Sequence, residues 1–425
     1  MDQDNKFEDE KDMIHEVVII GAGIAGLAAA LALKRVGIKS LVLERSSELR
    51  AFGTALHIFQ NGWRALEVLG VADKLDKTYN DFLTNMASVS NTETGSRQYV
   101  SSSGAGADSS VTLRIRPIHR KLLLETLAEE LPPESIKFLC KLLKIRSEVL
   151  EDSSTIYVLY LEDGSVIKAK VVIGCEGVNS VVAQWLGLKP PISSGRSAVR
   201  GVGLYPQGHD FKKEHQQFVG NGMKAGFIPI SNTEIYWYLN KASTSQDQEM
   251  ARVPEMIKSE VMETTKEFPL EYKQVVSHTD LSTLTIAPLL FRVPWDIVFG
   301  PSHRDCVTVT GDAFHPMTPD IAQGGCCALE DAVVLARNIA NTRHNVSHGI
   351  EMYVKERRWR AARLVAGSYI AGMLGHCKAS GMLGSVLESF RNSVFNWILH
   401  SKYGSLNYDC GALPVAANSN LEAKF

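Results

Sequence analysis

The feature that most constrains the fold is a strand, glycine turn, helix and strand pattern between His15 and Glu44. Residues 17–20 are all β-branched and have the composition of a buried parallel strand. The turn GAGIAG at 21–26 leads into an Ala- and Leu-rich segment of good helix formers. Residues 38–43 predict a second buried strand. This order is typical of a βαβ unit.

The three glycines of the turn have separate expected roles. Gly21 permits the tight turn, Gly23 lets a pyrophosphate approach the backbone, and Gly26 allows close helix packing. The helix N-terminus favours negative charge, and Glu44 is placed to accept a hydrogen bond from a ribose 2′-OH. The pattern therefore predicts a dinucleotide and leaves FAD and NAD open. The candidate residues here are Gly21, Gly23, Ile24, Ala25, Gly26, Glu44 and Arg45.

Composition limits the class of protein. The chain has 425 residues, 45% hydrophobic and 22% charged, as expected of a soluble globular protein with several domains. A net charge of −2 gives no indication of a nucleic-acid partner. Seven cysteines without a CxxC motif indicate reduced thiols. We see no signal peptide and no transmembrane segment, and we expect a cytoplasmic protein.

Buried strands recur near residues 17, 38, 171 and 307, with antiparallel-looking sequence between them. One α/β nucleotide-binding domain built from separated segments, with a sheet domain inserted, explains this order. The expected boundaries are 14–85, 110–190 and 300–345 for the Rossmann-like nucleotide-binding domain, 86–109 and 191–299 for a mainly antiparallel β-sheet substrate domain, 346–406 for C-terminal helices, and 1–13 and 407–425 for flexible ends.

Local patterns predict further elements. A DG turn predicts a hairpin of 156–160 with 166–168, and 281–286 is expected to be a strand. The low-complexity stretch 101–110 predicts a loop. Helices are expected over 62–69, 121–130, 247–268, 325–339 and 350–371.

Two more buried strands end in an acid beside a glycine, at Glu176-Gly177 and at Gly311-Asp312. Ligands of open α/β sheets bind at the carboxyl ends of strands, where such acids accept hydrogen bonds from ribose or ribityl hydroxyls. The run 319–325 then opens a helix whose free N–H groups are suited to the negatively charged edge of a flavin.

These pieces resemble the flavoprotein monooxygenases of the para-hydroxybenzoate hydroxylase and zeaxanthin epoxidase type. The chain is most similar to the plant FAD-dependent monooxygenases that are themselves similar to bacterial salicylate hydroxylase. The matching motifs are GAGIAG with Glu44, Arg120 before a Leu-rich helix, CEGVNS, and GDAFHPMTPDIAQGGCCALEDAVVLA. They occur in the family's order over about residues 15–340, and together they favour FAD over NAD as the dinucleotide.

The resemblance implies roles for individual residues. The first turn and Glu44 would hold the ADP half of FAD, and Arg120, by itself an ordinary solvated arginine, would reach the cofactor. Glu176 and Gly177 would serve both FAD and NAD(P)H. Gly311 and Asp312 would bind the ribityl and pyrophosphate region. The residues expected along the isoalloxazine are Pro319, Ala322, Gln323, Gly324 and Gly325.

The sequence departs from the family pattern at three positions. Glu176 replaces the usual Asp, and Ala322 stands where glycine is usual, so its methyl group restricts the backbone. His57 lies in a segment that lines the flavin in relatives. It is either a peripheral residue or a polar group near flavin or substrate that titrates near neutral pH. His57 is the one catalytic candidate, while His315 is expected to have no catalytic role.

The implied function is that of an FAD-dependent monooxygenase. NAD(P)H would reduce the flavin, and O₂ would form a C4a-hydroperoxyflavin that hydroxylates or epoxidises a lipophilic aromatic or alkene substrate. We expect no metal. The alternatives are an FAD-dependent oxidase, reductase or rearrangement enzyme without oxygen insertion, and a non-enzymatic flavoprotein. Five residues are expected either to line the substrate site or to form a sheet core: Phe227, Ile228, Tyr236, Trp237 and Tyr238.

Overall fold

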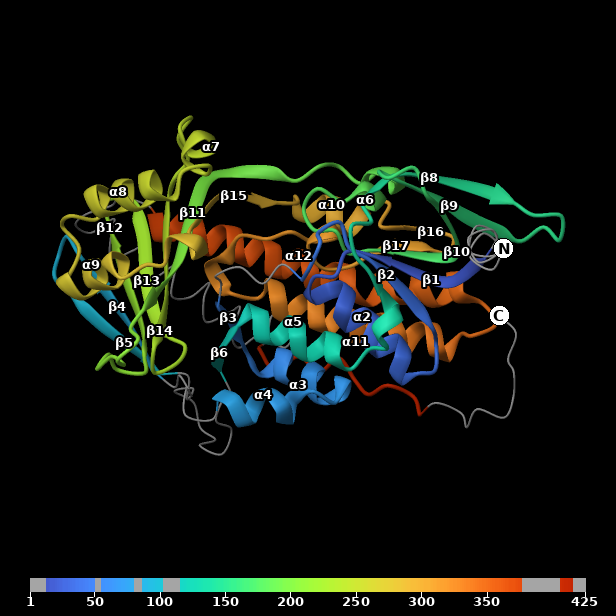
Figure 1. Ribbon diagram of the computed structural model, residues 1–425, viewed down its shortest axis with the longest axis horizontal. Coiled ribbons are helices and arrows are strands. Elements are labelled where there is room, and N and C mark those ends of the chain that lie inside the picture. Colours follow the sequence, from blue (N-terminus) through green and yellow to red (C-terminus); the bar gives the residue numbers. More distant parts are fainter. Residues whose placement is uncertain (1–12, 50–54, 80–85, 102–114, 377–405, 416–425) are drawn as a thin grey trace, which may run out of the picture.

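The expected βαβ unit lies at the centre of the first of two sheets. The computed structural model describes residues 13–49, 55–79, 86–101, 115–376 and 406–415 (Figure 1). Strand β1 (Ile14–Ile20) leads through the glycine turn into α2 (Ile24–Arg35) and then β2 (Ser40–Leu43). Strand β1 pairs in parallel with β2 and with β10 (Val166–Gly174), and β10 pairs in parallel with β17 (Val307–Val309). The four buried strands predicted from the sequence are therefore neighbours.

Strand β10 has two different partners along its length. Its first half pairs antiparallel with β9 (Thr155–Leu161), which confirms the hairpin predicted at the DG turn. Its second half is the buried parallel strand, so one strand serves both predicted features. Strand β8 (Leu142–Val149) extends the hairpin, while β16 (His303–Arg304) and β7 (Ile136–Lys137) form the edges.

Alternate residues of β1 point into two cores on opposite faces of this sheet. Val17 and Ile19 pack towards α2, α3 (Gln60–Leu69), α5 (Arg120–Glu129) and α11 (Gly324–Asn341). Val18 and Ile20 pack towards α6 (Val181–Leu186), α10 (Pro294–Phe299) and α12 (Val346–His376). Helix α4 (Ala72–Tyr79) lies beside α3 and α5. The parallel strands are thus covered on both faces, as expected of an α/β sheet.

The second sheet has seven strands in the order β15-β11-β14-β13-β12-β4-β5 and lies on the left of Figure 1. Among the strands that the structure describes in this sheet, only β12 and β4 pair in parallel. Two strands from the region 86–101 complete a sheet whose other strands come from 192–291. The bounds are β4 (Met86–Asn91), β5 (Arg97–Ser101), β11 (Ile192–Leu204), β12 (His215–Gly220), β13 (Met223–Pro229), β14 (Glu234–Ala242) and β15 (Thr285–Phe291).

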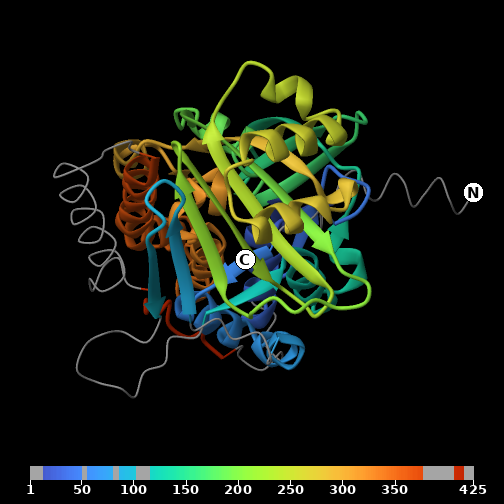
Figure 2. The same ribbon diagram turned by 90° about the vertical axis from the view of Figure 1, so that its left-hand side faces the viewer.

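Helices cover the outer face of the second sheet. Figure 2 shows α8 (Pro254–Thr264) and α9 (Leu270–Ser277), both yellow, over these strands. Phe227, Trp237 and Tyr272 are fully buried in the core between them. Helix α7 (Asp247–Met250) precedes α8, so the predicted helical region 247–268 is confirmed, whereas α9 was not predicted.

The structure differs from the expected strand at 281–286. Residues Leu281–Thr283 form a short 3-10 turn, and β15 starts only at Thr285. The Asp280 carboxylate accepts a hydrogen bond from the Ser282 N–H at 3.0 Å, and the Thr283 hydroxyl donates to the Asp280 carbonyl at 2.7 Å. Such local side-chain bonds compete with strand pairing and stabilise a turn instead.

The long helix α12 connects the two parts of the molecule. It contacts α10 and α11 of the first part and β12 and β13 of the second. Residues 406–415, most of which the sequence predicts to be flexible, pack against the first part, with Cys410 fully buried. The expected flexible residues 1–12 and 416–425 and most of the predicted loop at 101–110 lie outside the described residues.

The remaining short elements connect the larger ones. They are the two-stranded sheet of β3 (Ala55–Ile58) and β6 (Arg116–His119), and the 3-10 turns η2 (Pro133–Ser135), η4 (Gly311–Ala313) and η5 (Pro319–Ile321).

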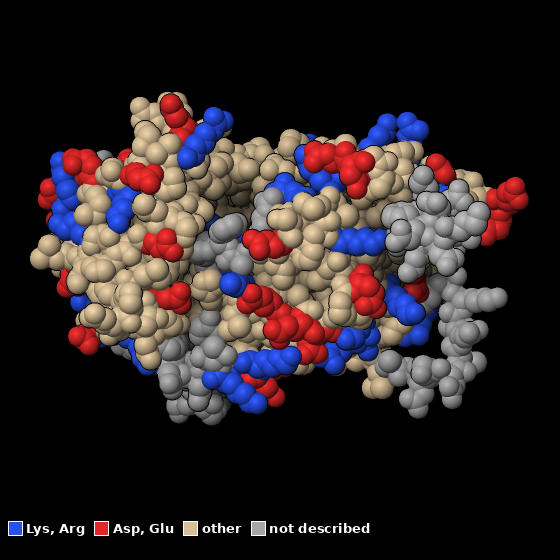
Figure 3. Space-filling view, viewed as in Figure 1, with Lys and Arg blue, Asp and Glu red and all other residues tan. Residues whose placement is uncertain are grey.

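Within the described ranges no helix has the length and apolarity needed to cross a membrane. Lys and Arg lie close to Asp and Glu over much of the face in Figure 3.

Candidate active site

A cavity of about 640 Å³ lies between the carboxyl ends of the parallel strands and one face of the second sheet. Its volume falls within the range of about 300–1,000 Å³ for small-molecule sites. Most of the residues predicted from the sequence line it. These are Gly21, Gly23, Ile24, Ala25, Glu44, Arg45, His57, Arg120, Glu176, Gly177, Asp312, Pro319, Ala322, Gly324 and Gly325. The predicted residues Gly26, Gly311 and Gln323 do not line it.

The first glycine turn is required by the fold at two positions and leaves room at the third. Gly21 has a φ of +102°, and a Cβ there would lie 2.7 Å from the carbonyl oxygen of Cys175. A Cβ at Gly26 would lie 1.9 Å from the carbonyl oxygen of Gly21. A Cβ at Gly23 would meet no protein atom within 4 Å. Space is therefore kept in front of Gly23, where a pyrophosphate is expected.

Glu44 has a structural role that the motif alone did not suggest. Its Oε2 accepts a hydrogen bond from the Ala22 N–H at 2.8 Å, and its Oε1 accepts one from the Ser46 N–H at 2.9 Å. The carboxylate thus braces the glycine turn against the end of β2. Each carboxylate oxygen retains acceptor capacity, so Glu44 is also able to accept a hydrogen bond from a ligand hydroxyl in the cavity.

Glu176 turns back towards α6. Ser180 Oγ donates to its Oε2 at 2.6 Å, and its Oε1 accepts hydrogen bonds from the Val181 and Val182 N–H groups at 3.0 and 3.1 Å. Burial raises the pKa of Glu176 although these bonds stabilise its anion. The extra methylene relative to Asp therefore lets this side chain satisfy the first N–H groups of a helix.

The second acidic turn, which contains Asp312, is fixed by hydrogen bonds to Asp331 and Arg292. Gly311 has a φ of +55°, and its N–H donates to Asp331 Oδ2 at 2.9 Å. The buried guanidinium of Arg292 donates to the carbonyl oxygens of Phe314 and Ala313 at 2.9 and 3.1 Å. These bonds hold the backbone that presents Asp312 to the cavity.

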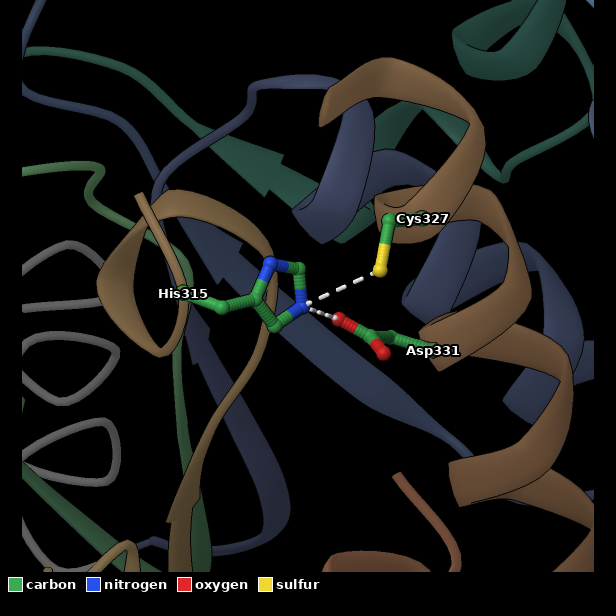
Figure 4. A group of neighbouring side chains, drawn as sticks. All are labelled: His315, Cys327 and Asp331. Atoms are coloured by element: carbon green, nitrogen blue, oxygen red, sulfur yellow. Dashed lines mark hydrogen bonds and ion pairs between the residues drawn. The ribbon is translucent and has the colours of Figure 1, made fainter. Parts of the chain in front are cut away.

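A buried ionic cluster supports this turn, as Figure 4 shows for three of its members. His315 Nε2 lies 2.6 Å from Asp331 Oδ2 and 3.7 Å from Cys327 Sγ. Arg357 Nε donates to Asp331 Oδ1 at 2.7 Å, and its Nη2 lies 3.2 Å from Cys327 Sγ. Burial alone would raise the pKa of Asp331, but His315 and Arg357 lower it to about 2.

His315, Cys327 and Asp331 are residue types that bind metals, and their ligand atoms lie within 4.8 Å of one another. The guanidinium of Arg357 already supplies positive charge to this group and lies against both Cys327 and Asp331. A second cation there would be repelled. We therefore assign the group as a structural ion-pair cluster. His315 does not line the cavity.

The same cluster extends to Gln323. Asn61 Nδ2 donates to Gln323 Oε1 at 2.9 Å and to Glu330 Oε1 at 2.6 Å. Arg360 Nε donates to Glu330 Oε2 at 2.6 Å. The Gln323 side chain is fully buried and points into the protein, so the expected contact with a ring in the cavity applies only to its backbone.

Ala322 has an unusual backbone conformation. Its φ and ψ are +51° and 35°, in the left-handed region. An L-residue with a Cβ pays about 1–2 kcal/mol for this conformation. Ala322 follows η5 and lines the cavity with Pro319. The departure from glycine therefore stores strain beside the expected isoalloxazine position.

Strand alternation settles the question of the five residues at 227–238. Phe227 and Trp237 belong to the core under α8 and α9, whereas Tyr236 and Tyr238 line the cavity. Ile228 packs in a small cluster with Ala55 and Tyr236. The other residues of this sheet that line the cavity are polar, a feature that sequence reasoning missed because it depends on strand register. Its further lining residues are Arg200, His215, Gln217, Lys224 and Asn240.

His57 meets this polar face. Its ring stacks on that of His215 with 4.9 Å between centroids. His57 Nε2 is buried without a hydrogen-bond partner among the described residues. Burial lowers the pKa of His57 to about 4 and that of His215 well below its ordinary value. His57 is thus a polar group at the cavity, but it does not titrate near neutral pH.

Comparisons with known proteins agree with this arrangement. Residues 15–368 match the family model described as an FAD binding domain. The chain is 36% identical over 421 residues to "Monooxygenase 2" of Arabidopsis thaliana, covering 95% of this chain and 99% of that protein. It is also 36% identical over 371 residues to "Monooxygenase 1" of the same plant, covering 84% and 89%. The structure of Klebsiella pneumoniae HpxO complexed with FAD and uric acid has a TM-score of 0.75 and 23% identity, covering 93% and 96%.

Proposed function

The chain belongs to the FAD-binding flavoprotein monooxygenases, and from this premise we propose that it uses NAD(P)H and O₂ to insert one oxygen atom into a small aromatic or alkene substrate. FAD supplies the redox chemistry when bound, by taking electrons from NAD(P)H and passing them to O₂. The route of oxygen transfer expected from the family resemblance stays a prediction.

The two glycine turns and Arg120 are proposed to hold FAD. The open space before Gly23 suits the pyrophosphate, with the α2 N–H groups and the helix dipole favouring its charge. Glu44 would accept a hydrogen bond from the adenosine ribose, and Asp312 one from the ribityl chain. The turn from Pro319 to Gly325 would lie along the isoalloxazine, at the junction with the second sheet.

The observation that carries the proposal is that both parts of the molecule face one cavity. The nucleotide-type glycine turns line one end, and Tyr236 and Tyr238 of the second sheet line the other. A reacting ring placed near Ala322 would therefore meet a substrate held against the tyrosines. Placement of the cavity between the two sheets would also limit access of water to the reacting atoms.

The polar lining refines the expected substrate. Aromatic rings at 236 and 238 favour a planar substrate, whereas Arg200, Asn240 and Lys224 offer hydrogen bonds and charge. An aromatic compound with polar substituents suits this face better than a wholly aliphatic alkene. The substrate is therefore proposed to be lipophilic only in its ring system.

The test begins with purified protein. We expect it to carry FAD or to gain thermal stability when FAD is added, and to consume NADH or NADPH faster when a suitable aromatic compound is present. Incorporation of one ¹⁸O atom from ¹⁸O₂ into the product would establish oxygen insertion. Substrate turnover without ¹⁸O would instead support an FAD-dependent oxidase, reductase or rearrangement enzyme, a candidate favoured by the departures at Glu176 and Ala322.

A further inference from the structure

Three exposed aromatic side chains form one cluster where α10 and α12 meet. Trp295 and Phe299 of α10 stack with 6.0 Å between ring centroids, and the ring of Trp359 on α12 lies nearly perpendicular to that of Phe299 at 6.3 Å. Trp295 is 63% exposed, Phe299 74% and Trp359 43%. The rings of this aromatic cluster therefore contact one another and leave much of their surface in water.

The aromatic cluster is additional to the core between the two helices. That core contains Ile297 and Val298 of α10 and Ala361 and Ala362 of α12, all of them buried. Three aromatic side chains of about 150–250 Å² each leave roughly 300–450 Å² of surface in water at the exposed fractions given above. A contiguous apolar patch of this size on a protein surface is typical of an interaction site.

Cations accompany the aromatic cluster on α12. Lys355 and Arg363 lie one helical turn before and after Trp359, so the three residues share one side of the helix. Lys355 is exposed and Arg363 is half-buried. Positive charge therefore lies on both sides of the Trp359 ring along the helix axis.

The acids nearest in sequence to the rings are already paired. Asp296 Oδ1 lies 3.0 Å from Nζ of Lys189, whose side chain is 76% exposed. Glu356 Oε2 lies 2.7 Å from Nη2 of Arg337. These acids therefore offer little uncompensated negative charge, and the surroundings of the aromatic cluster favour an anionic partner.

Area and charge favour one kind of partner over a second copy of the chain. Each side of a stable protein interface contributes about 800 Å², roughly twice the area of the aromatic cluster. A second copy that met this surface across a two-fold axis would also bring the same cations together. An anionic bilayer needs no such area, because a few aromatic rings at headgroup level and several cations act together as its anchor.

We propose that the aromatic cluster is a peripheral binding site for an anionic lipid bilayer. Trp295, Phe299 and Trp359 insert at the level of the headgroups, and the neighbouring cations contact lipid phosphates and carboxylates. The three rings do not line the cavity. The inference therefore goes beyond the proposed function and does not rest on it.

The test uses the purified 425-residue chain and two kinds of vesicle. One kind is phosphatidylcholine alone, and the other is an equimolar mixture of phosphatidylcholine and phosphatidylserine. We expect the protein to sediment with the mixed vesicles, to bind the neutral vesicles more weakly, and to lose affinity for the mixed vesicles as salt is raised. No sedimentation with the mixed vesicles would overturn the proposal.

Tryptophan fluorescence measures whether the rings enter the bilayer. Lipids with brominated acyl chains quench tryptophans that insert, and we expect mixed vesicles made with them to quench the emission of the protein. Trp63 and Trp237 are fully buried in the protein and are not accessible to this quencher. Trp295→Phe should keep vesicle binding, because the ring remains aromatic, and should reduce the quenching. Binding without any quenching would contradict insertion of the cluster.

Two surface variants separate the aromatic and the ionic contributions. Phe299→Ser should lower the affinity for mixed vesicles at least about tenfold, because the bilayer no longer buries that ring. Lys355→Glu should lower it at least about fivefold. Both side chains are exposed, so the melting temperatures and FAD content should stay close to those of the unaltered protein. Unchanged vesicle affinity in Phe299→Ser would refute the assignment.

Matched controls make the same kinds of change on the second part of the molecule. Tyr99→Ser removes an aromatic ring that is 58% exposed on β5, and Lys266→Glu reverses an exposed cation that pairs with Glu263. Both should bind mixed vesicles as the unaltered protein does. Sedimentation without lipid measures self-association. A dimer that Phe299→Ser abolishes, in a protein that does not bind vesicles, would assign the cluster to a second copy of the chain instead.

Discussion

The Asp331 carboxylate accepts a hydrogen bond from the backbone N–H of Gly311 at 2.9 Å, although neither residue lines the cavity. Helix α11 therefore holds the turn that presents Asp312. The other oxygen of Asp331 accepts from Arg357 on α12, so two helices and a strand end meet at one carboxylate. The buried ion pair of Asp331 and Arg357 thus fixes the turn that carries Asp312, a residue proposed to bind FAD.

The ion pair predicts a large stability effect for Arg357→Leu. The substitution leaves the fully buried carboxylates of Asp331 and Glu330 without the guanidinium that contacts both. Breaking a buried pair by removing one partner costs about 3–5 kcal/mol. Urea unfolding should show this loss. The control Glu162→Gln removes an exposed pair with Lys141 and should cost less than about 1 kcal/mol.

The glycine turn predicts that substitution of Gly23 impairs FAD binding, whereas substitution of Gly26 impairs the stability of the protein. Gly23→Val should abolish FAD binding and leave the stability of the FAD-free protein nearly unchanged, because its Cβ meets no protein atom. Gly26→Val should destabilise the protein itself, because its Cβ would lie 1.9 Å from a backbone oxygen. FAD titration and thermal unfolding measure the two effects. A yellow, fully loaded Gly23→Val protein would be inconsistent with the proposed pyrophosphate position.

The left-handed backbone at Ala322 predicts that glycine is tolerated and a β-branched residue is not. Ala322→Gly relieves about 1 kcal/mol of backbone strain. This gain offsets the larger loss of conformational entropy that glycine undergoes on folding, so the melting temperature should stay the same or rise. Ala322→Val should lower it. If Ala322→Gly leaves flavin reoxidation unchanged as well, the methyl group has no part in the chemistry.

Burial of His57 predicts a pH effect on stability. The unfolded chain takes up a proton at this residue near pH 6.5, whereas the folded protein does so only near pH 4. Stability is therefore lost as pH falls from about 6.5 to about 4. His57→Phe keeps a stacking ring and removes the titration. Urea unfolding at several pH values should give a shallower loss for the variant, and parallel curves would refute the assignment.

The sequence by itself determined the nucleotide-binding part. The order of β-branched strand, glycine turn, helix and acid from His15 to Glu44 specifies β1, α2 and β2 through local patterns of propensity and periodicity. An acidic residue directly beside a glycine, at Glu176-Gly177 and at Gly311-Asp312, similarly marked the ends of two parallel strands. Local rules suffice there because each motif contains its own strand end and turn.

Only the tertiary structure decided which sequence features face the cavity. Sequence alone left Tyr236, Trp237 and Tyr238 equivalent, because assigning faces requires knowing which side of the sheet α8 and α9 cover. The pairing of His57 with His215 joins strands from the two parts of the molecule. The position of Gly226 opposite Tyr238 is likewise seen only in the register of β13 and β14. Contacts between segments far apart in the chain depend on packing, and no local pattern encodes them.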